Sequence, residues 1–440
     1  HGKICRTNLP PNTAFRGFGG PQGTLNTENI IEEIANYLKK DSYEIRRLNC
    51  YGIDERNVTH YGKVFYNNVL PEIFDELHKK SDYKERFDSI KEFNSNSKTH
   101  LKGISLSPVK FGISFTTKFL NQGSALVNIY LDGSVQVSTG GTEMGQGLNT
   151  KIRQIVADEF SIDYENIRIM DTSTEKNNNT SPTAASSGTD INGSAAVLAC
   201  TAIRDRLADF AAQHFSSPEE GIVKSKNNIV FKDNYVFDDR KPHKKISFKD
   251  LIPLAYRERV NLGERAFYQT PGVDFNRETG KGNPFLYFTN GAAVSEVLID
   301  KFTGELKILR ADILIDIGQS INLGIDRGQV IGGFIQGAGW LTSEELKYTD
   351  KGYLLSHSPT TYKIPNITDM PDIFNVEFFK NEENTVNVKK SKAVGEPPLL
   401  LGISVWTAVK HALSFVSKNR VTLNTPATNE EIVMRIAEFE

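Results

Sequence analysis

Residues 125–160 read ALVNIYLDGSVQVSTGGTEMGQGLNTKIRQIVADEF and contain three structural signals in succession. Apolar and polar residues alternate on both sides of Asp132-Gly133, a pattern typical of a β-hairpin. The glycine-rich run 140–147 follows the second strand. It precedes apolar residues at helical spacing, namely Ile152, Ile155, Val156 and Phe160. A sheet, a glycine loop and a helix therefore follow one another.

The combination of a glycine loop and a helix recurs along the chain. Residues 1–24 are rich in Gly and Pro, and Thr27 then reads as the N-cap of a helix. That helix carries an apolar stripe of Ile30, Ile31, Ile34, Ala35 and Leu38. A third run, 328–339, has glycines at helical spacing, which predicts close helix packing. The loop KAVGEPPLLLG, residues 392–402, precedes a further helix.

Other segments complete the expected architecture. Residues 171–194 form a long polar stretch without an apolar period, and a helix is expected from 195 to 215. Strands are expected around a turn at Thr303-Gly304. Because strands and helices mix without a regular βαβ period, the sequence predicts an α+β fold with mixed sheets. The charged stretch 79–98 indicates a solvated connection or exposed helices, with a boundary nearby.

Composition limits the class of protein. The 440 residues are 38% hydrophobic and carry a formal charge of −2, so a large core is possible and nucleic acid is not an expected partner. The three cysteines lack paired spacing, which argues against a disulfide framework, a zinc ribbon or an iron–sulfur cluster on this chain. No apolar run is long enough for a membrane span, and we expect a cytoplasmic location.

The glycine loops suggest an anionic ligand. Backbone N–H groups at a helix N-terminus favour negative charge, although each loop could equally be a simple tight turn. Neither a GxxxxGK[ST] motif nor a strand-GxGxxG-helix unit occurs, so an ordinary P-loop or Rossmann enzyme is not expected. Gln146, Gln329 and Gln336 are neutral donors and acceptors suited to a polar cofactor, or otherwise ordinary packing residues.

Glu396 is the most suggestive single residue. It lies among Ala393, Val394, Pro397 and Leu399, and desolvation there would raise its pKa toward that of a general base or acid. The alternatives are a solvent-facing carboxylate and a cap on the next helix. Arg16 could clamp a phosphate or carboxylate, or form a structural salt bridge. Phe18 and Phe115 could stack on a substrate, or belong to the core.

At these residues the chain resembles the molybdenum hydroxylase family, in the form found in its xanthine dehydrogenases of the bacterial, multi-subunit type. The resemblance is carried by TNLPPNTAFRGFGGPQG (7–23), KFGISFTTKFLNQG (110–123), DGSVQVSTGGTEMGQGLNTK (132–151), NTSPTAASSGTDINGSA (179–195), GNPFLYFTNGAAVSEV (282–297), GQVIGGFIQGAGWLTSEEL (328–346) and KAVGEPPLL (392–400). It implies a molybdenum atom held by the dithiolene of an anionic pterin rather than by protein side chains. It also implies hydroxylation of hypoxanthine or xanthine to urate, with water as the oxygen source.

The resemblance also implies roles for individual residues. Glu396 would be the general base. Phe18 and Phe115 would sandwich the purine, with Thr116 and Ala184 beside it. The residues implied to contact the molybdopterin cofactor are Arg16, Gln146, Ala185, Ser186 and Gln329. Electrons would leave for iron–sulfur clusters and FAD on a partner domain or subunit, within an assembly expected to be a homo-oligomer.

The resemblance further implies a division of the chain. Residues 1–80 would be the tail of a first molybdopterin-binding subdomain and a connection, and residues 81–440 a second subdomain. Upstream motifs of the family do not occur here, so we expect the first half of the molybdenum domain to be supplied by a further polypeptide or to have been cut away. The alternatives are an aldehyde or N-heterocycle hydroxylase of the same family, and an inactive isolated fragment.

Overall fold

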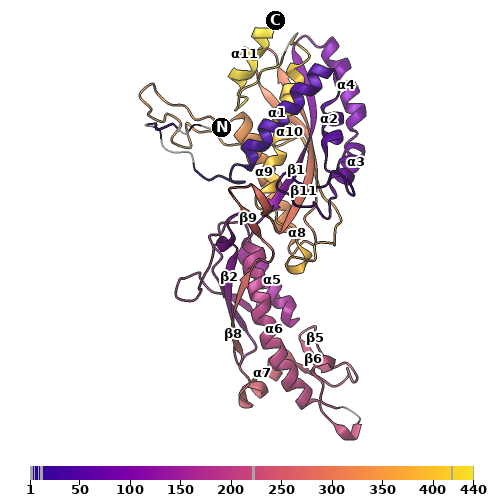
Figure 1. The fold of residues 1–440 in the computed structure, drawn as a ribbon, viewed down its shortest axis with the longest axis vertical. Helices are drawn as coiled ribbons and strands as arrows, with labels where there is room; N and C mark the ends of the chain where they lie inside the picture. Colours follow the sequence, from indigo (N-terminus) through magenta and orange to yellow (C-terminus); the bar gives the residue numbers. More distant parts are fainter. Residues whose placement is uncertain are drawn as a thin grey trace.

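The chain folds into two lobes joined end to end, as the computed structural model in Figure 1 shows. The structure describes residues 3, 5–7, 9, 13–220, 223–417 and 420–439. The upper lobe contains both ends of the described chain. The lower lobe is formed by the middle of the sequence, which leaves the upper lobe after β1 (His100–Ile113) and returns in β11 (Tyr287–Asp300).

The upper lobe is a four-stranded sheet with helices on both faces. The strand order is β1, β11, β12 (Leu306–Ile315) and β13 (Ile373–Phe378), with β12 and β13 parallel and the other pairs antiparallel. One face packs against α8 (Leu323–Thr342), α9 (Pro397–Leu401), α10 (Ile403–Leu413) and α11 (Asn429–Phe439). The other face packs against α3 (Leu70–Lys80) and α4 (Tyr83–Asn96). Helices α1 (Gly20–Leu38) and α2 (Ser42–Asn49) lie beside α10 and the edge strand β1.

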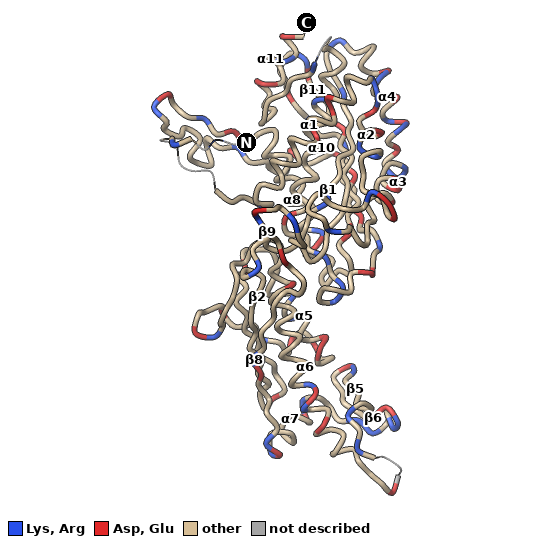
Figure 2. Tube along the Cα trace, viewed as in Figure 1, with Lys and Arg blue, Asp and Glu red and all other residues tan. Residues whose placement is uncertain are grey.

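The lower lobe has its own core. Its sheet order is β4 (Ile167–Ile169), β3 (Val135–Thr139), β2 (Gln122–Ile129) and β8 (Gly263–Gln269), covered by α5 (Leu148–Phe160) and α6 (Gly188–His214). The tip consists of β5 (Ile229–Lys232), β6 (Tyr235–Asp238), β7 (Lys245–Ser247) and α7 (Phe248–Arg257). A short ribbon of β9 (Asp274–Asn276) and β10 (Lys281–Asn283) lies near the junction of the lobes. Lys and Arg alternate with Asp and Glu over both lobes (Figure 2).

The opening stretch of sequence folds as expected. Strands β2 and β3 pair antiparallel around Asp132-Gly133, where Gly133 has a φ of 82°. Helix α5 then begins directly after the glycine loop, with Gly147 as its N-cap. The turn between β11 and β12, the helix over 328–339 and the helix after residues 392–402 are also confirmed. The expectation of an α+β fold with mixed sheets is confirmed by this topology.

The prediction for the first helix was wrong in two respects. Helix α1 begins at Gly20, and Thr27 lies inside it, donating its hydroxyl to the Gly23 carbonyl rather than capping the helix. Its apolar stripe is not the buried face: Ile30 is 50% exposed, and of the stripe only Ala35 is buried, together with Glu28 and Glu32. The reason is Arg46 of α2, whose guanidinium binds both carboxylates at 2.5 and 2.6 Å.

Two further boundaries differ from expectation. Helix α6 begins at Gly188 rather than at residue 195, because the polar residues of its first turns pack against other polar groups instead of forming an apolar stripe. The charged stretch 79–98 forms α4, whose buried face of Tyr83, Phe87 and Ile90 joins the core under the upper sheet. The division of the chain at residue 80 stays a prediction.

Candidate functional site

Three segments far apart in sequence meet between the lobes. The first is the loop around Arg16 that leads into α1, the second is the loop around Ser186 that leads into α6, and the third carries Glu396, the residue immediately before α9. Their hydrogen bonds join residues separated by more than 200 positions, including one of 210 between Ser186 and Glu396. The fold therefore brings together residues from both lobes.

The Glu396 carboxylate is held at both oxygens. Oε1 accepts from the Gly17 amide at 3.3 Å, and Oε2 accepts from the Ser186 hydroxyl at 2.9 Å. The Ser186 hydroxyl also accepts from the Glu396 amide at 2.8 Å, so one side chain fixes both ends of the glutamate. Burial raises the pKa of Glu396, while Ser186, Gly17 and Arg16 act to lower it. Its side chain does not cap α9, so that alternative is excluded.

Arg16 is anchored on α8 and on the segment that carries Glu396. Its Nε donates to the Gly395 carbonyl, and Nη1 donates to Gln336 Oε1 at 3.1 Å. Nη2 donates to both the carbonyl and the side chain of Gln329, each at 3.3 Å. Burial lowers the pKa of Arg16, and the nearby Glu396 charge raises it. Two of the three glutamines singled out in the sequence therefore position this arginine.

The loop before α6 places backbone donors near the region between the lobes where the Arg16, Ser186 and Glu396 segments meet. We call this region the seam. Ala185 and Ser186 both adopt left-handed conformations, with φ of 54° and 56°. In the described part of the chain, the first-turn amides of Gly188 and Thr189 have no hydrogen-bond partner. Consecutive backbone N–H groups in such a bend form a concavity suited to an anion. Ala185 and Ser186 are two of the residues that the resemblance implies to contact the cofactor, whereas the glycine loops from which the sequence predicted an anion site lie elsewhere in the chain.

The glycine loop before α5 behaves differently. Its amides at Gly145, Gly147 and Asn149 donate to the carboxylate of Glu143 at 2.8 to 3.0 Å, so the chain supplies its own anion there. Gln146 bonds within the same loop, accepting from the Met144 amide at 2.5 Å. The loop still adjoins the site, because the Thr142 amide donates to Thr183 at 2.9 Å. Sequence reasoning missed Glu143; a carboxylate two residues before a glycine in a helix-opening loop is the signal that could have identified it.

The residues expected around the substrate are mostly exposed to solvent. Phe18 is 77% exposed and has a φ of 44°. Thr116 and Ala184 are exposed, and Phe115 is half-buried. Asn121 fixes the Phe115 backbone by bonding both its amide and its carbonyl, at 2.9 and 2.8 Å. Neither phenylalanine belongs to a hydrophobic core cluster of the described residues, so neither is the core residue that the alternative interpretation required.

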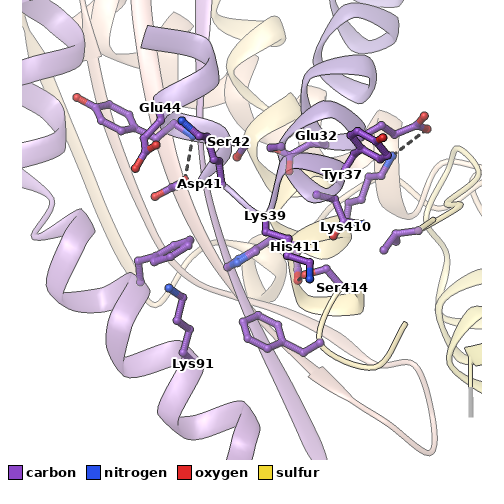
Figure 3. A pocket seen from close by; sticks show the side chains of 18 of the residues that line it. Glu32, Tyr37, Lys39, Asp41, Ser42, Glu44, Lys91, Lys410, His411 and Ser414 are labelled. Atoms are coloured by element: carbon purple, nitrogen blue, oxygen red, sulfur yellow. Dashed lines mark hydrogen bonds and ion pairs between the residues drawn. The ribbon is translucent and has the colours of Figure 1, made fainter. Parts of the chain in front are cut away.

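A cavity of about 990 Å³ lies elsewhere, between α1, α2, α4 and α10 (Figure 3). None of the predicted site residues lines it. His411 projects into it with Nδ1 accepting from the Ile104 amide at 3.1 Å, and its ring lies parallel to that of Phe87 at 5.1 Å. The candidate site is thus defined by its contacts rather than by this cavity.

Comparison with known proteins identifies the family. A family model described as a molybdopterin cofactor-binding domain matches residues 76–371, and a second model of that description matches residues 1–50. The chain belongs to the molybdopterin cofactor-binding domain family. The resemblance to molybdenum hydroxylases that the motifs indicated is confirmed.

Curated relatives of this molybdopterin-binding chain are named xanthine dehydrogenase. The protein of Dictyostelium discoideum is 44% identical over 439 residues, which cover 98% of this chain and 30% of the relative. The xanthine dehydrogenase/oxidase of Felis catus is 42% identical, covering 98% of this chain and 31% of the relative. The chain spans about a third of the length of these relatives.

Solved structures share the fold. Quinoline 2-oxidoreductase from Pseudomonas putida 86 superimposes with a TM-score of 0.83 at 24% identity, covering 97% of this chain and 53% of that one. Aldehyde oxidoreductase from Desulfovibrio desulfuricans gives a TM-score of 0.76, covering 96% and 41%. Among the described residues, no helix is long and apolar enough to cross a bilayer.

The seam fits an anionic pterin cofactor. The Arg16 guanidinium and the amides of Gly188 and Thr189, which follow the Ala185–Ser186 bend, supply donors, and Gln146 and Gln329 border the same region. The described residues contain no group of three or more His, Cys, Asp or Glu side chains placed to hold a metal. The donors at the seam, backbone amides and a guanidinium, are groups that favour an anionic ligand.

Proposed function

We propose that this chain supplies one half of the molybdenum site of an enzyme that hydroxylates a purine such as hypoxanthine or xanthine. The observation that carries the proposal is the Glu396 carboxylate, held by Gly17 and Ser186 beside Arg16 at the seam of the lobes. The names of the relatives, at 42% to 44% identity, support the choice of a purine.

In this proposal Glu396 is the general base. Oxidation of the substrate by two electrons is the chemistry that a bound molybdenum cofactor would supply. Glu396 takes up the proton of the water-derived oxygen at Oε1 or Oε2, and its pKa, raised by burial, makes it a better proton acceptor than an ordinary carboxylate. Ser186 and Gly17 keep the carboxylate in one orientation, which preserves alignment with the substrate.

The remaining residues bind and orient. Arg16 and the Ala185–Ser186 bend hold the anionic pterin, with Gln146 and Gln329 at its edges. The rings of Phe18 and Phe115 receive the flat purine between them, and Thr116 and Ala184 border it. Because Phe18 is exposed and Phe115 lies outside the hydrophobic core clusters of the described residues, space for a planar substrate does not require displacement of core residues.

The complete enzyme extends beyond this chain. Iron–sulfur clusters and FAD on other domains or subunits would receive the electrons, and a further part of the molybdenum domain would complete the pocket. We propose a cytoplasmic homo-oligomer for the assembly. The described thiols, Cys5, Cys50 and Cys200, are all unpaired, which suits a reducing compartment.

The test is a substitution in the complete protein that contains this chain. Glu396→Gln preserves shape and removes the base, so turnover of xanthine should fall by about 10²- to 10⁴-fold while molybdenum content is unchanged. Glu165→Gln, an exposed carboxylate in the lower lobe, is the matched control and should leave turnover intact. Turnover of Glu396→Gln within about threefold of the parent would reject the base.

Substrate choice needs a separate measurement. The values of kcat/KM for xanthine, an aromatic aldehyde and quinoline should rank xanthine first. A higher value for either of the others would replace the proposal by an aldehyde or N-heterocycle hydroxylase. Molybdenum analysis of this chain purified alone tests whether it retains cofactor or serves only as a structural half.

A further inference from the structure

The segment that leads to Glu396 is fixed by a strand of the upper sheet. The Ala393 amide donates to the Tyr287 hydroxyl at 3.0 Å, and the Ala393 carbonyl accepts from Thr289 Oγ1 at 2.9 Å. Tyr287 and Thr289 are two residues apart on β11 and therefore point to the same face of the sheet. The amide and the carbonyl of Ala393, three residues before Glu396, are thus both held by β11.

The Tyr287 hydroxyl is itself oriented by a carboxylate from the other lobe. It donates to Asp190 Oδ2 at 2.7 Å, and Asn387 Nδ2 donates to Asp190 Oδ1 at 3.0 Å. Asp190 and Tyr287 are each 6% exposed. A tyrosine hydroxyl has one proton. Because that proton is committed to Asp190, the oxygen lone pairs remain available to the Ala393 amide.

Asp190 lies in the first turn of α6, four residues after Ser186. The start of α6 therefore contacts the Glu396 segment in two ways. The Ser186 hydroxyl binds the Glu396 side chain, and Asp190 acts on the backbone through its hydrogen bond to Tyr287, which binds Ala393. We propose that Asp190, acting through Tyr287, is a positioning residue that sets the place of Glu396 relative to the lower lobe. This inference rests on the function proposed above.

Burial opposes the charged form of Asp190, and three neighbouring groups favour it. Burial raises the pKa of Asp190 to about 6, and the hydroxyl of Tyr287, the amide of Asn387 and the ammonium of Lys151 act to lower it. Lys151 comes from α5 and is paired with Asp326 at 2.5 Å. Above this pKa the carboxylate can only accept, which fixes Tyr287 as the donor.

Tyr287→Phe in the complete protein is the test, because it keeps the ring and removes both hydrogen bonds. Hydrogen exchange of residues 391–396, measured without cofactor, should accelerate at least tenfold, because the Ala393 amide loses its acceptor. The kcat for xanthine should fall about tenfold, and KM should stay within twofold.

Tyr83→Phe is the matched control. Tyr83 is fully buried and donates to Asp41 at 2.9 Å, so it loses an equivalent Tyr–Asp bond in the upper lobe away from the seam. It should change neither exchange at 391–396 nor kcat. Asp190→Asn keeps an acceptor for Tyr287 and should restore most of the activity that Asp190→Ala loses.

Two results would overturn the inference. One is parental exchange at 391–396 in Tyr287→Phe, and the other is an equal loss of kcat in Tyr83→Phe. The exchange measurement does not depend on turnover. If Glu396→Gln were fully active, the proposed function would fail, while the exchange result would still decide whether this chain of bonds holds the segment.

Discussion

Gly337 is the position where one added methyl group should disturb the site most. It lies on α8 where that helix crosses α9, the short helix that begins directly after Glu396. A Cβ at Gly337 would lie 2.0 Å from the Leu399 carbonyl oxygen and 3.0 Å from its carbon. Ordinary contact begins near 3.4 Å, so the two backbones would have to separate by about 1.4 Å.

The expected cost of Gly337→Ala follows from that geometry. Both partners are backbone and cannot rotate away, so the penalty should reach the upper end of the range for overpacking, about 3 kcal/mol. Gly332 lies on the same helix, and a Cβ there meets nothing within 4 Å. Gly332→Ala should therefore stabilise the protein by about 0.5 to 1 kcal/mol, through helix propensity alone.

Denaturant unfolding of the two variants, followed by helical circular dichroism, measures the difference. The variants should differ by about 4 kcal/mol in the free energy of unfolding, with Gly337→Ala the less stable. Gly337→Ala should also lower turnover, because the shift of α9 moves Glu396. Equal stability of the two variants, within about 0.5 kcal/mol, would refute the close contact between α8 and α9 as the reason for the glycine.

Three further perturbations have defined outcomes. Ser186→Ala removes a hydrogen bond that lowers the pKa of Glu396, so the acid limb of kcat/KM, where the base becomes protonated, should move to higher pH; a limb at lower pH would contradict this sign. Arg46→Met leaves Glu28 and Glu32 buried without a cation and should cost about 3 to 5 kcal/mol. Because burial already raises the pKa of Glu28 in the folded state, that loss should be larger at pH 8 than at pH 5 in parallel unfolding experiments. Glu143→Ala removes the acceptor for the loop before α5 and should cost about 0.5 to 2 kcal/mol, whereas Glu143→Gln should cost less. Since the folded-state pKa of Glu143 is lowered, its contribution should be present at neutral pH and disappear as the pH falls through that pKa, as stability measured from pH 7 to pH 3 would show.

The periodicity of apolar residues predicted those strands and helices that bury one face and expose the other. The β2–β3 hairpin and α5 show clear apolar periods because one face of each packs on the lower core. The same reasoning failed for helix α1, because two glutamates, Glu28 and Glu32, lie on its buried face. Its buried carboxylates are neutralised by Arg46, a partner that periodicity cannot reveal. The start of α6 was missed for a similar reason, since Asp190 there is buried against Tyr287 and Asn387.

The site was predictable only in parts. The apolar neighbours of Glu396 indicated a desolvated carboxylate, and burial does raise its pKa. The partners of that carboxylate, Gly17 and Ser186, are 379 and 210 positions away, and no local pattern joins them. The resemblance implied only that Ser186 contacts the cofactor, and it gave no role to Gly17. The glycine loop at 140–147 was predicted to bind an anionic ligand, whereas its amides donate to the chain's own Glu143.

The manner in which the lower lobe is attached has a mechanical consequence. The chain enters and leaves that lobe at Ile113 and Tyr287, which face each other as a cross-strand pair. A rotation of the lower lobe about these two strands would move Ser186 away from Glu396, and the hydrophobic core of each lobe would stay intact. Tyr287 is one residue of this cross-strand pair. The position of Glu396 and the angle between the lobes therefore both depend on Tyr287.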